Sequence, residues 1–206
     1  MEINKELQDF LNDDHVLDLI ADHDWAKLFS MQTLSGRTIN CSQLHRVLLN
    51  SGIASTQEIL DILGYVPDGF FRDFRSLENI TIPSSVTSIG DHAFEACISL
   101  KNIAIPDGVT SIGDCAFMDC HELTSIVLPN NITDISQCIF IRCSSLTSIT
   151  IPDSVTNIAF GAFSGCSSLT SITIPDSVTS ILQRAFKDCS NLTSVTLSNN
   201  ITKIDW

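Results

Sequence analysis

The chain has 206 residues, of which 24 are acidic and 11 are basic, so its formal net charge is −13. This excess of negative charge excludes nucleic acid as a direct ligand, because the phosphate backbone would be repelled. No run approaches the roughly 18 apolar residues of a membrane span. The first residues also lack the basic and apolar regions of a signal peptide, so we expect a cytoplasmic protein with no membrane partner.

Residues 1–70 carry no repeat, and their apolar spacing predicts a small helical domain. The apolar residues of its first stretch are Leu7, Phe10, Leu11, Val16, Leu17 and Ile20. A later helix is expected to begin after Asn40, and another has a capping box of Ser55 with Glu58 and ends at Gly64. The domain is expected to cap the repeats that follow, since solenoid ends need covering. A separate partner-binding role for these helices is the alternative.

From residue 71 onward one phrase recurs every 23 residues. The segment "IPDSVTNIAFGAFSGCSSLTSIT", residues 151–173, is followed at once by "IPDSVTSILQRAFKDCSNLTSVT". The array consists of a partial copy at 71–81, five full copies at 82–196 and half a copy at 197–206. A fixed period in this range predicts a solenoid in which each unit stacks on its neighbours. We therefore divide the chain into a helical capping domain, 1–70, and a solenoid, 71–206.

Each repeat divides into three pieces. "LTSITI" alternates apolar and hydroxyl side chains, as in a short strand with Leu146, Ile149 and Ile151 inward. "PDS" predicts a turn, "VTNI" a second extended piece, and "GAFSGCSS" a short helical or turn segment. One inward position holds Cys97, Cys120, Cys143, Cys166 and Cys189. Free cysteine there acts as a small apolar residue, so no disulfides are required and a reducing compartment is expected.

The pattern "IPxxVTxIGxxAFxxCxxLTSIxIP" resembles the repeat of the BspA-like leucine-rich-repeat family. The resemblance covers residues 71–206 and is specific, because the pattern recurs in five tandem copies. It implies an α/β repeat fold: a leucine-rich-repeat solenoid of short parallel strands, here preceded by a small N-terminal helical cap domain. It also implies binding rather than catalysis. Many BspA-like proteins are surface adhesins, and similar short proteins occur in bacteriophage genomes. The N-terminus departs from the adhesin pattern because it does not resemble a signal peptide.

The outward positions of the predicted strands form a flat, nearly uncharged candidate binding face. Its residues are Asn79, Thr81, Asn102, Ser125, Val127, Ser148, Thr150, Ser171, Thr173, Ser194 and Thr196. Solenoids commonly bind along such a face, although the aromatic and arginine anchors typical of binding hot spots are missing from it. The alternative is that strand register alone favours Ser and Thr here, with no ligand.

Irregular positions offer a second candidate surface. Phe160 and Leu182 stand where other repeats have glycine or polar residues, and they occur in adjacent repeats. They are therefore a candidate exposed apolar patch. Packing of both side chains against the local turn is the alternative.

Catalytic and metal chemistry find little support in the sequence. His92, Cys115 and Cys138 share one position of successive repeats, about 5 Å apart, which would suit either a metal or a disulfide between the cysteines. No metal-binding spacing such as CxxC accompanies them. A shared turn position, where turn chemistry already favours aspartate, holds Asp107, Asp153 and Asp176. Because no phosphate loop, nucleophile motif or pair of catalytic carboxylates occurs, we predict no enzyme activity, no cofactor and no metal.

Three functions stay open at this point. The first is a protein–protein interaction module that binds a protein partner, steered by charge if the partner is basic, through the repeat surface. The second is an acidic inhibitor of a basic host or defence enzyme, of the kind that phages or mobile elements encode. The third is a BspA-like surface adhesin. A homodimer through the open C-terminal end is a further hypothesis, since only half a repeat and Trp206 cover that end.

Overall fold

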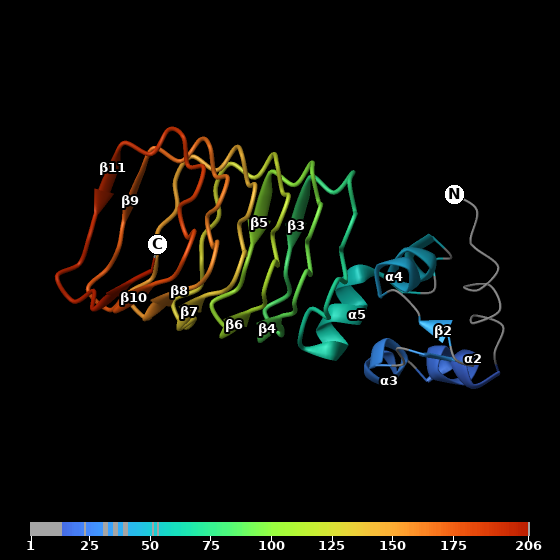
Figure 1. Cartoon of the computed structure of the whole chain (residues 1–206). Helices are drawn as coiled ribbons and strands as arrows, with labels where there is room; N and C mark the ends of the chain where they lie inside the picture. The colour runs from blue at the N-terminus through green and yellow to red at the C-terminus, as the bar shows by residue number, and fades with distance from the viewer. Residues whose placement is uncertain are drawn as a thin grey trace.

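The computed structural model of the chain describes residues 14–22, 24–30, 33–34, 37–38, 41–50, 52 and 54–205. A group of short helices leads into a solenoid in which each turn of the chain lies beside the next (Figure 1). The paired strands of the solenoid are parallel and 23 residues apart in register. The predicted solenoid of short parallel strands, with small helices before it, is therefore confirmed.

The helices before the solenoid are short. They are α2 (Asp14–Ala21), α3 (Trp25–Ser30), α4 (Cys41–Asn50) and α5 (Thr56–Leu63). A hairpin of β1 (Thr33–Leu34) and β2 (Arg37–Thr38), which the apolar spacing did not indicate, lies between α3 and α4. The predicted capping of α5 is confirmed: Ser55 accepts from the N–H of Glu58, and Gly64 ends the helix with φ 69°. Leu17 is exposed, contrary to its expected place on the apolar face. The predictions at Leu7, Phe10, Leu11 and Asn40 lie outside the described residues.

Two columns of strands run along the solenoid. The first contains β3 (Asn79–Thr81), β5 (Asn102–Ala104), β9 (Ser171–Thr173) and β11 (Ser194–Thr196). The second contains β4 (Ser88–Ile89), β6 (Ser111–Ile112), β7 (Asp134–Ile135), β8 (Asn157–Ile158), β10 (Ser180–Ile181) and β12 (Lys203–Ile204). In the first column β3 pairs with β5 and β9 with β11. The equivalent segments 125–127 and 148–150 lie between these pairs without being strands, so this ladder is interrupted in the middle repeats.

A third side of the solenoid, which we call the turn face, is formed by residues 91–97 and their equivalents. These residues are turns, so of the two predicted alternatives the turn is confirmed. Their backbones pair with the next repeat: the N–H of Phe94 donates to the carbonyl of Ala116 at 2.8 Å, and that of Phe117 to Ile139 at 2.9 Å. Backbone pairing thus links successive turns on three sides, as the stacking of repeats requires.

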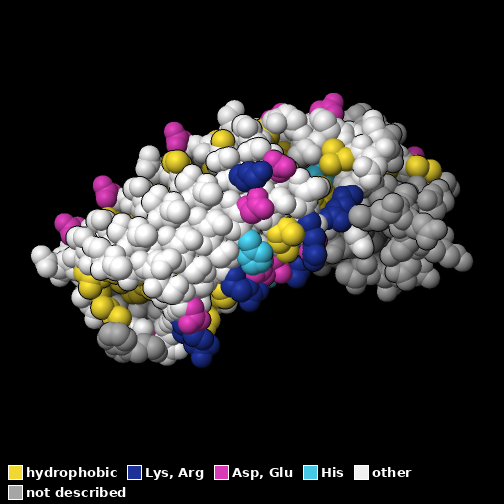
Figure 2. Space-filling view, turned by 90° about the horizontal axis from the view of Figure 1, so that it is seen from above, with side chains coloured by type: hydrophobic (Ala, Val, Ile, Leu, Met, Phe, Trp, Pro, Cys, Tyr) yellow, Lys and Arg dark blue, Asp and Glu magenta, His cyan; other side chains and the backbone are white. Residues whose placement is uncertain are grey.

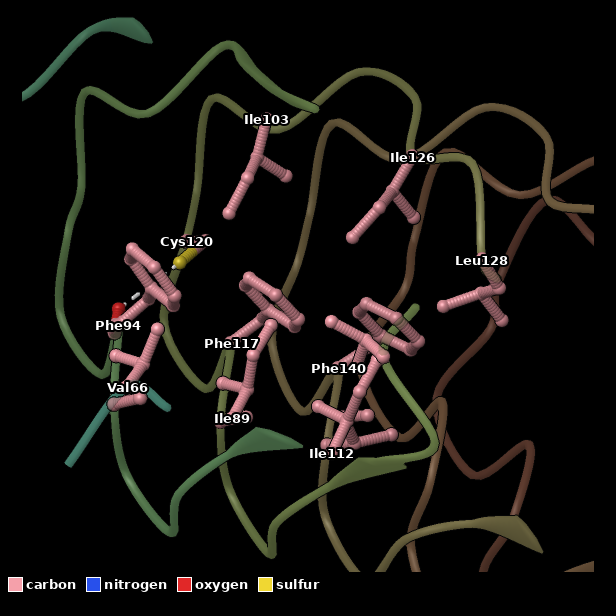
Figure 3. Packing of buried hydrophobic residues seen from close by; sticks show 14 of the residues in the cluster. Val66, Ile89, Phe94, Ile103, Ile112, Phe117, Cys120, Ile126, Leu128 and Phe140 are labelled. Carbon is pink, nitrogen blue, oxygen red and sulfur yellow. Dashed lines mark hydrogen bonds between the residues drawn. The ribbon is translucent and has the colours of Figure 1, made fainter. Parts of the chain in front are cut away.

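The core repeats with the sequence. Phe71, Phe94, Phe117, Phe140, Phe163 and Phe186 form one continuous stack, with ring centroids 4.8 to 5.6 Å apart. Beside it lie the five predicted cysteines, four of them buried and Cys189 half-buried. The thiol of Cys120 donates to the carbonyl of Phe94 at 3.2 Å, and the other four make the equivalent bond. The predicted interior row of free cysteines is therefore confirmed. Figure 3 shows one of them, Cys120, beside the stacked rings of Phe94, Phe117 and Phe140.

The helices meet the first turn of the solenoid through aromatic rings. His45 of α4 is fully buried, stacks on Phe70 at 4.0 Å and meets Phe71 edge-on at 5.2 Å. Phe29 of α3 also contacts Phe70, at 5.2 Å. Since Phe71 begins the phenylalanine stack, these contacts cover its N-terminal end.

Candidate functional site

The predicted binding residues all lie on the outward side of the first strand column, which we call the strand face. All are exposed: Asn79, Thr81, Asn102, Ser125, Val127, Ser148, Thr150, Ser171, Thr173, Ser194 and Thr196. They alternate with buried isoleucines such as Ile103 and Ile172, as side chains of a strand must. Val127, with 80% of its surface exposed, is the most exposed large apolar side chain in the part of the chain that the structure describes.

The strand face is hollowed at its C-terminal half. A groove of about 610 Å³ lies between the strands and the turns that follow them. The hydroxyl residues lining it are Ser148, Thr150, Ser171, Thr173, Thr196 and Ser198. Two carboxylates, Asp153 and Asp176, lie at its turn side. Apolar side chains also line it: Ile149, Ile151, Ile172, Ile174, Pro175 and Leu197. The groove is thus of mixed polarity with two negative charges, and it includes five of the eleven predicted residues.

The hydroxyls of the strand face differ from the other threonines of the repeat. Thr147 and Thr193 donate their hydroxyls to the backbone carbonyls of Thr124 and Thr170, one turn earlier, both at 3.3 Å. In a further column Thr87, Thr110, Thr156, Thr179 and Thr202 make the same bond to the preceding turn, whereas Thr133 donates to Asp134 instead. Within the described residues no such partner exists for the strand-face hydroxyls Ser148, Thr150, Ser171, Thr173, Ser194 and Thr196. These hydroxyls therefore do not hold the solenoid together and are available to a ligand.

The two groove carboxylates are also unpaired. Neither Asp153 nor Asp176 forms an ion pair with any residue that the structure describes. They occupy the same position of adjacent repeats, and both are exposed. Turn chemistry alone would explain one aspartate at this position, but two adjacent carboxylates without a neighbouring cation also create a local negative potential.

The second candidate surface is less open than the sequence suggested. Phe160 and Leu182 are both half-buried. The guanidinium of Arg184 lies over the Phe160 ring, 5.7 Å from its centroid. This arrangement fits the alternative of local packing, and the binding role of these two residues stays a prediction.

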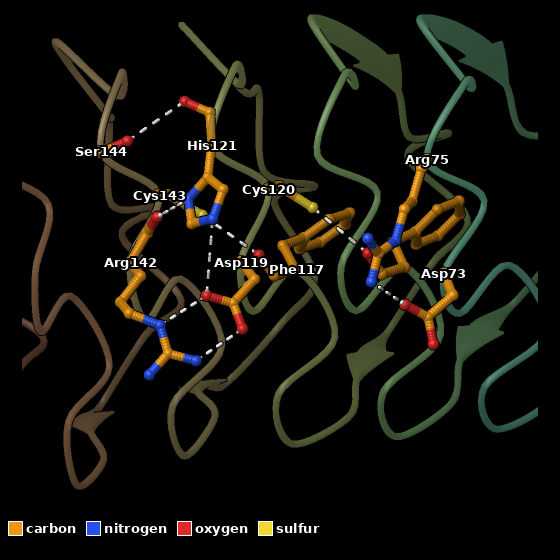
Figure 4. A network of polar contacts seen from close by, with 10 residues as sticks. Asp73, Arg75, Phe117, Asp119, Cys120, His121, Arg142, Cys143 and Ser144 are labelled. Atoms are coloured by element: carbon orange, nitrogen blue, oxygen red, sulfur yellow. Dashed lines mark hydrogen bonds and ion pairs between the residues drawn. The ribbon is translucent and has the colours of Figure 1, made fainter.

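Charged residues also gather on the turn face, where the sequence analysis predicted no charged site. Figure 2 shows Lys and Arg side chains in a band together with acidic and histidine side chains. Asp119 accepts two hydrogen bonds from the guanidinium of Arg142, which hold the pKa of that carboxyl below its usual range (Figure 4). Arg72 bonds Glu95 at 2.9 Å. Both pairs join charges 23 residues apart, a signal that the sequence contained. These two pairs neutralise the charges of Arg72 and Arg142 on the turn face. Neither arginine is paired with a carboxylate of the groove.

The repeats match a known family. A model of the BspA type leucine rich repeat region matches in six copies, over residues 64–158 and 116–206. The chain belongs to the BspA-type leucine-rich-repeat family. The family resemblance drawn from the repeat pattern is therefore confirmed. No curated protein is detectably similar in sequence.

Solved structures of bacterial leucine-rich-repeat proteins share this BspA-type fold. The Treponema pallidum leucine rich repeat protein TpLRR is 35% identical with a TM-score of 0.66, the match covering 68% of this chain and 66% of that one. A leucine rich cell surface protein from Faecalibacterium prausnitzii is 42% identical with a TM-score of 0.56, over 57% of this chain and 31% of that one. A leucine-rich repeat protein from Bacteroides ovatus is 30% identical with a TM-score of 0.59, over 68% and 43%. The chain thus matches two thirds or less of the length of these relatives.

Other site chemistry has no support in the described part of this BspA-type chain. No group of three or more His, Cys, Asp or Glu residues there is placed to hold a metal ion. None of the described helices is long and apolar enough to cross a membrane. Leucine-rich repeats are typically binding proteins, so the strand face and its groove are the site to which a function is best assigned.

Proposed function

We propose that this BspA-type repeat protein is a binding module whose strand face holds an extended, basic segment of a protein partner. The observation that carries the proposal is the groove, where unpaired hydroxyls of three successive repeats stand beside two unpaired carboxylates. An extended segment fits because the hydroxyls repeat along the solenoid axis and can bond a peptide backbone in both donor and acceptor roles. Lysine or arginine side chains fit because Asp153 and Asp176 offer charge without a competing cation.

The composition of the groove also predicts the character of binding. It has no tryptophan, tyrosine or arginine anchor, so affinity is expected to be moderate. Its exposed charges act over about 8 Å at physiological ionic strength, so binding is expected to weaken as salt increases. The net charge of −13 adds long-range attraction for a basic partner.

Panning a library of random unstructured peptides against the immobilised full chain tests this function. Selected peptides should be enriched in Lys and Arg, and the double variant Asp153→Asn with Asp176→Asn should reduce their affinity several-fold. Asp107→Asn is the matched control, because Asp107 occupies the same turn position outside the groove. Enrichment without basic residues, or an equal loss in the control, would contradict the proposal.

The hydroxyl side of the groove needs its own variant. Ser171→Arg places a long cation in the centre of the groove and should abolish peptide binding. Ser111→Arg, at an exposed position of the second strand column, should leave binding unchanged. If both substitutions reduce binding to the same extent, the peptide does not occupy the strand face.

Surface adhesion is the second candidate function. It is favoured by the F. prausnitzii relative, which is described as a cell surface protein. Protease treatment of intact cells separates the two locations, because a surface adhesin is cleaved there whereas a cytoplasmic module is protected. Capture of a basic enzyme whose activity falls on binding would instead support the inhibitor hypothesis.

A further inference from the structure

Two half-buried cysteines lie on consecutive turns of the turn face, away from the groove. Cys115 follows β6 and Cys138 follows β7, 23 residues later. Their backbones have matching conformations, with φ of 55° and 54°. The N–H of Cys115 donates to the carbonyl of Gln137 at 2.9 Å, which holds the two cysteines in register. Chains paired in this way lie about 5 Å apart, within the Cα separation that a disulfide spans.

The two thiols also interact electrostatically, because Cys138 raises the pKa of Cys115 and Cys115 lowers that of Cys138. On the other side of Cys138 the same position holds Gly161, where an added Cβ would lie 3.3 Å from the sulfur. With glycine there, the side of the Cys138 sulfur opposite Cys115 is free of a neighbouring side chain. Thiol exchange passes through a mixed disulfide, and the glycine leaves room beside the Cys138 sulfur for the external group of that intermediate.

We propose that Cys115 and Cys138 form a reversible disulfide, made by exchange with a small-molecule disulfide such as oxidised glutathione. First, the Cys138 thiolate attacks one sulfur of the external disulfide, and the other sulfur leaves as a thiolate. Then the Cys115 thiolate attacks the Cys138 sulfur and displaces the remaining external group past Gly161. Two protein thiols are oxidised, the external disulfide is reduced to two thiols, and these take up the two protons that the cysteines release.

The order of the steps follows from the neighbours of the two thiols. The position beyond Cys115 holds His92, whereas the one beyond Cys138 holds Gly161, so Cys138 is the more open sulfur and the first nucleophile. Burial raises the pKa of both thiols, and for Cys115 the neighbouring Cys138, Asp114 and Glu95 raise it further, to about 11. The reaction should therefore speed up as the pH rises through the alkaline range. The core cysteines are shielded from the reagent and bonded to backbone carbonyls.

The test treats the full chain with oxidised glutathione under native, mildly alkaline conditions. Two of the eight thiols should be lost, peptide mapping should find Cys115 linked to Cys138, and dithiothreitol should restore both. Linking two turns should raise Tm by about 5–10 °C, because it constrains the unfolded chain. Glutathione adducts without this link, a link between other cysteines, or no loss of native thiols would each overturn the proposal.

Single variants separate the two steps. Cys115→Ser should stop at a stable glutathione adduct on Cys138, whereas Cys138→Ser should react at least several-fold more slowly at Cys115. Cys41→Ser is the matched control, since Cys41 is also half-buried but lies in α4, and it should behave as the unmodified chain does. Equal adduct rates at Cys115 and Cys138 would contradict the assigned order.

Discussion

At the scale of single residues, Gly90 and Gly113 are required because the preceding turn approaches them closely, and not because of their backbone conformation. Asp91 accepts a hydrogen bond from the N–H of Asp114 at 2.8 Å, and Asp68 makes the equivalent bond to Asp91. A Cβ on Gly113 would lie 2.3 Å from the bonding oxygen of Asp91 and 2.5 Å from its backbone nitrogen. A methyl group there must displace the backbone of the preceding turn.

Gly113→Ala is therefore expected to destabilise the protein by about 2 kcal/mol or more. Urea unfolding followed by circular dichroism measures this. Gly108→Ala is the control, because its nearest neighbouring atoms would be 3.7 Å from the new methyl group and its effect should stay within about 0.5 kcal/mol. Similar losses in the two variants would show that close approach is not the cause.

His45 makes stability depend on pH. Burial lowers its pKa to about 4, while its Nε2 lies 2.9 Å from the hydroxyl of Thr56. In the unfolded chain this histidine has a pKa of about 6.5 and is protonated below that pH, whereas in the folded chain it stays neutral down to about pH 4. Stability is thus unaffected above pH 6.5 and falls as the pH drops toward 4, by roughly 3 kcal/mol in total.

His45→Phe keeps the ring stack and removes the titration, so its Tm should fall less between pH 6.5 and 4 than that of the parent chain. Thermal unfolding at a series of pH values gives the comparison. If the two curves run parallel over this interval, His45 is not the titrating group.

At the scale of the elements, the threonines bonded to the preceding turn and the threonines of the strand face have different roles. Thr179 donates to the carbonyl of Thr156 in the preceding turn, whereas the hydroxyl of Thr173 points from the strand face without a described partner. Thr179→Val should cost about 0.5–1 kcal/mol in the free energy of unfolding and leave peptide binding intact. Thr173→Val should leave the free energy of unfolding unchanged and weaken peptide binding. Denaturant melts and binding titrations on both variants check the pair, and a swapped outcome would refute the division of roles.

The elements show which parts of the structure the sequence can predict. A period of 23 residues aligns Phe94 with Phe117 and Cys97 with Cys120, so the stacked core was predictable from spacing alone. The groove was not predictable, because its depth depends on how far each turn projects beyond the strand that precedes it. Before the solenoid no period exists, and there the hairpin β1–β2 and the burial of His45 gave no signal. A histidine between aromatic neighbours is chosen by tertiary packing rather than by helix propensity.

At the scale of the whole molecule, the last turns expose apolar side chains. Val195 of β11, Leu197 and Ile204 of β12 are 43%, 50% and 42% exposed. A strand edge flanked by such side chains favours pairing with another chain. We therefore expect the 206-residue chain to form a homodimer through this end at high concentration.

Sedimentation equilibrium over a range of concentrations measures this association. Val195→Lys together with Leu197→Lys should shift the equilibrium to monomer without loss of helix or strand signal. Leu17→Lys, at an equally exposed leucine of α2, is the control and should not affect association. A parent chain that stays monomeric at the highest concentration contradicts the expectation.

The matching register of every junction has a consequence for how this architecture varies. Each turn meets its neighbours through the same phenylalanine ring, the same thiol-to-carbonyl bond and the same backbone pairs. Duplication or loss of one 23-residue unit therefore preserves the ring stack and the thiol-to-carbonyl bond, whereas a pair made at a single junction, such as Arg142 with Asp119, depends on which unit changes. The number of repeats can therefore change while the packing of the interior stays the same, and each added or lost repeat lengthens or shortens the surface that faces a partner.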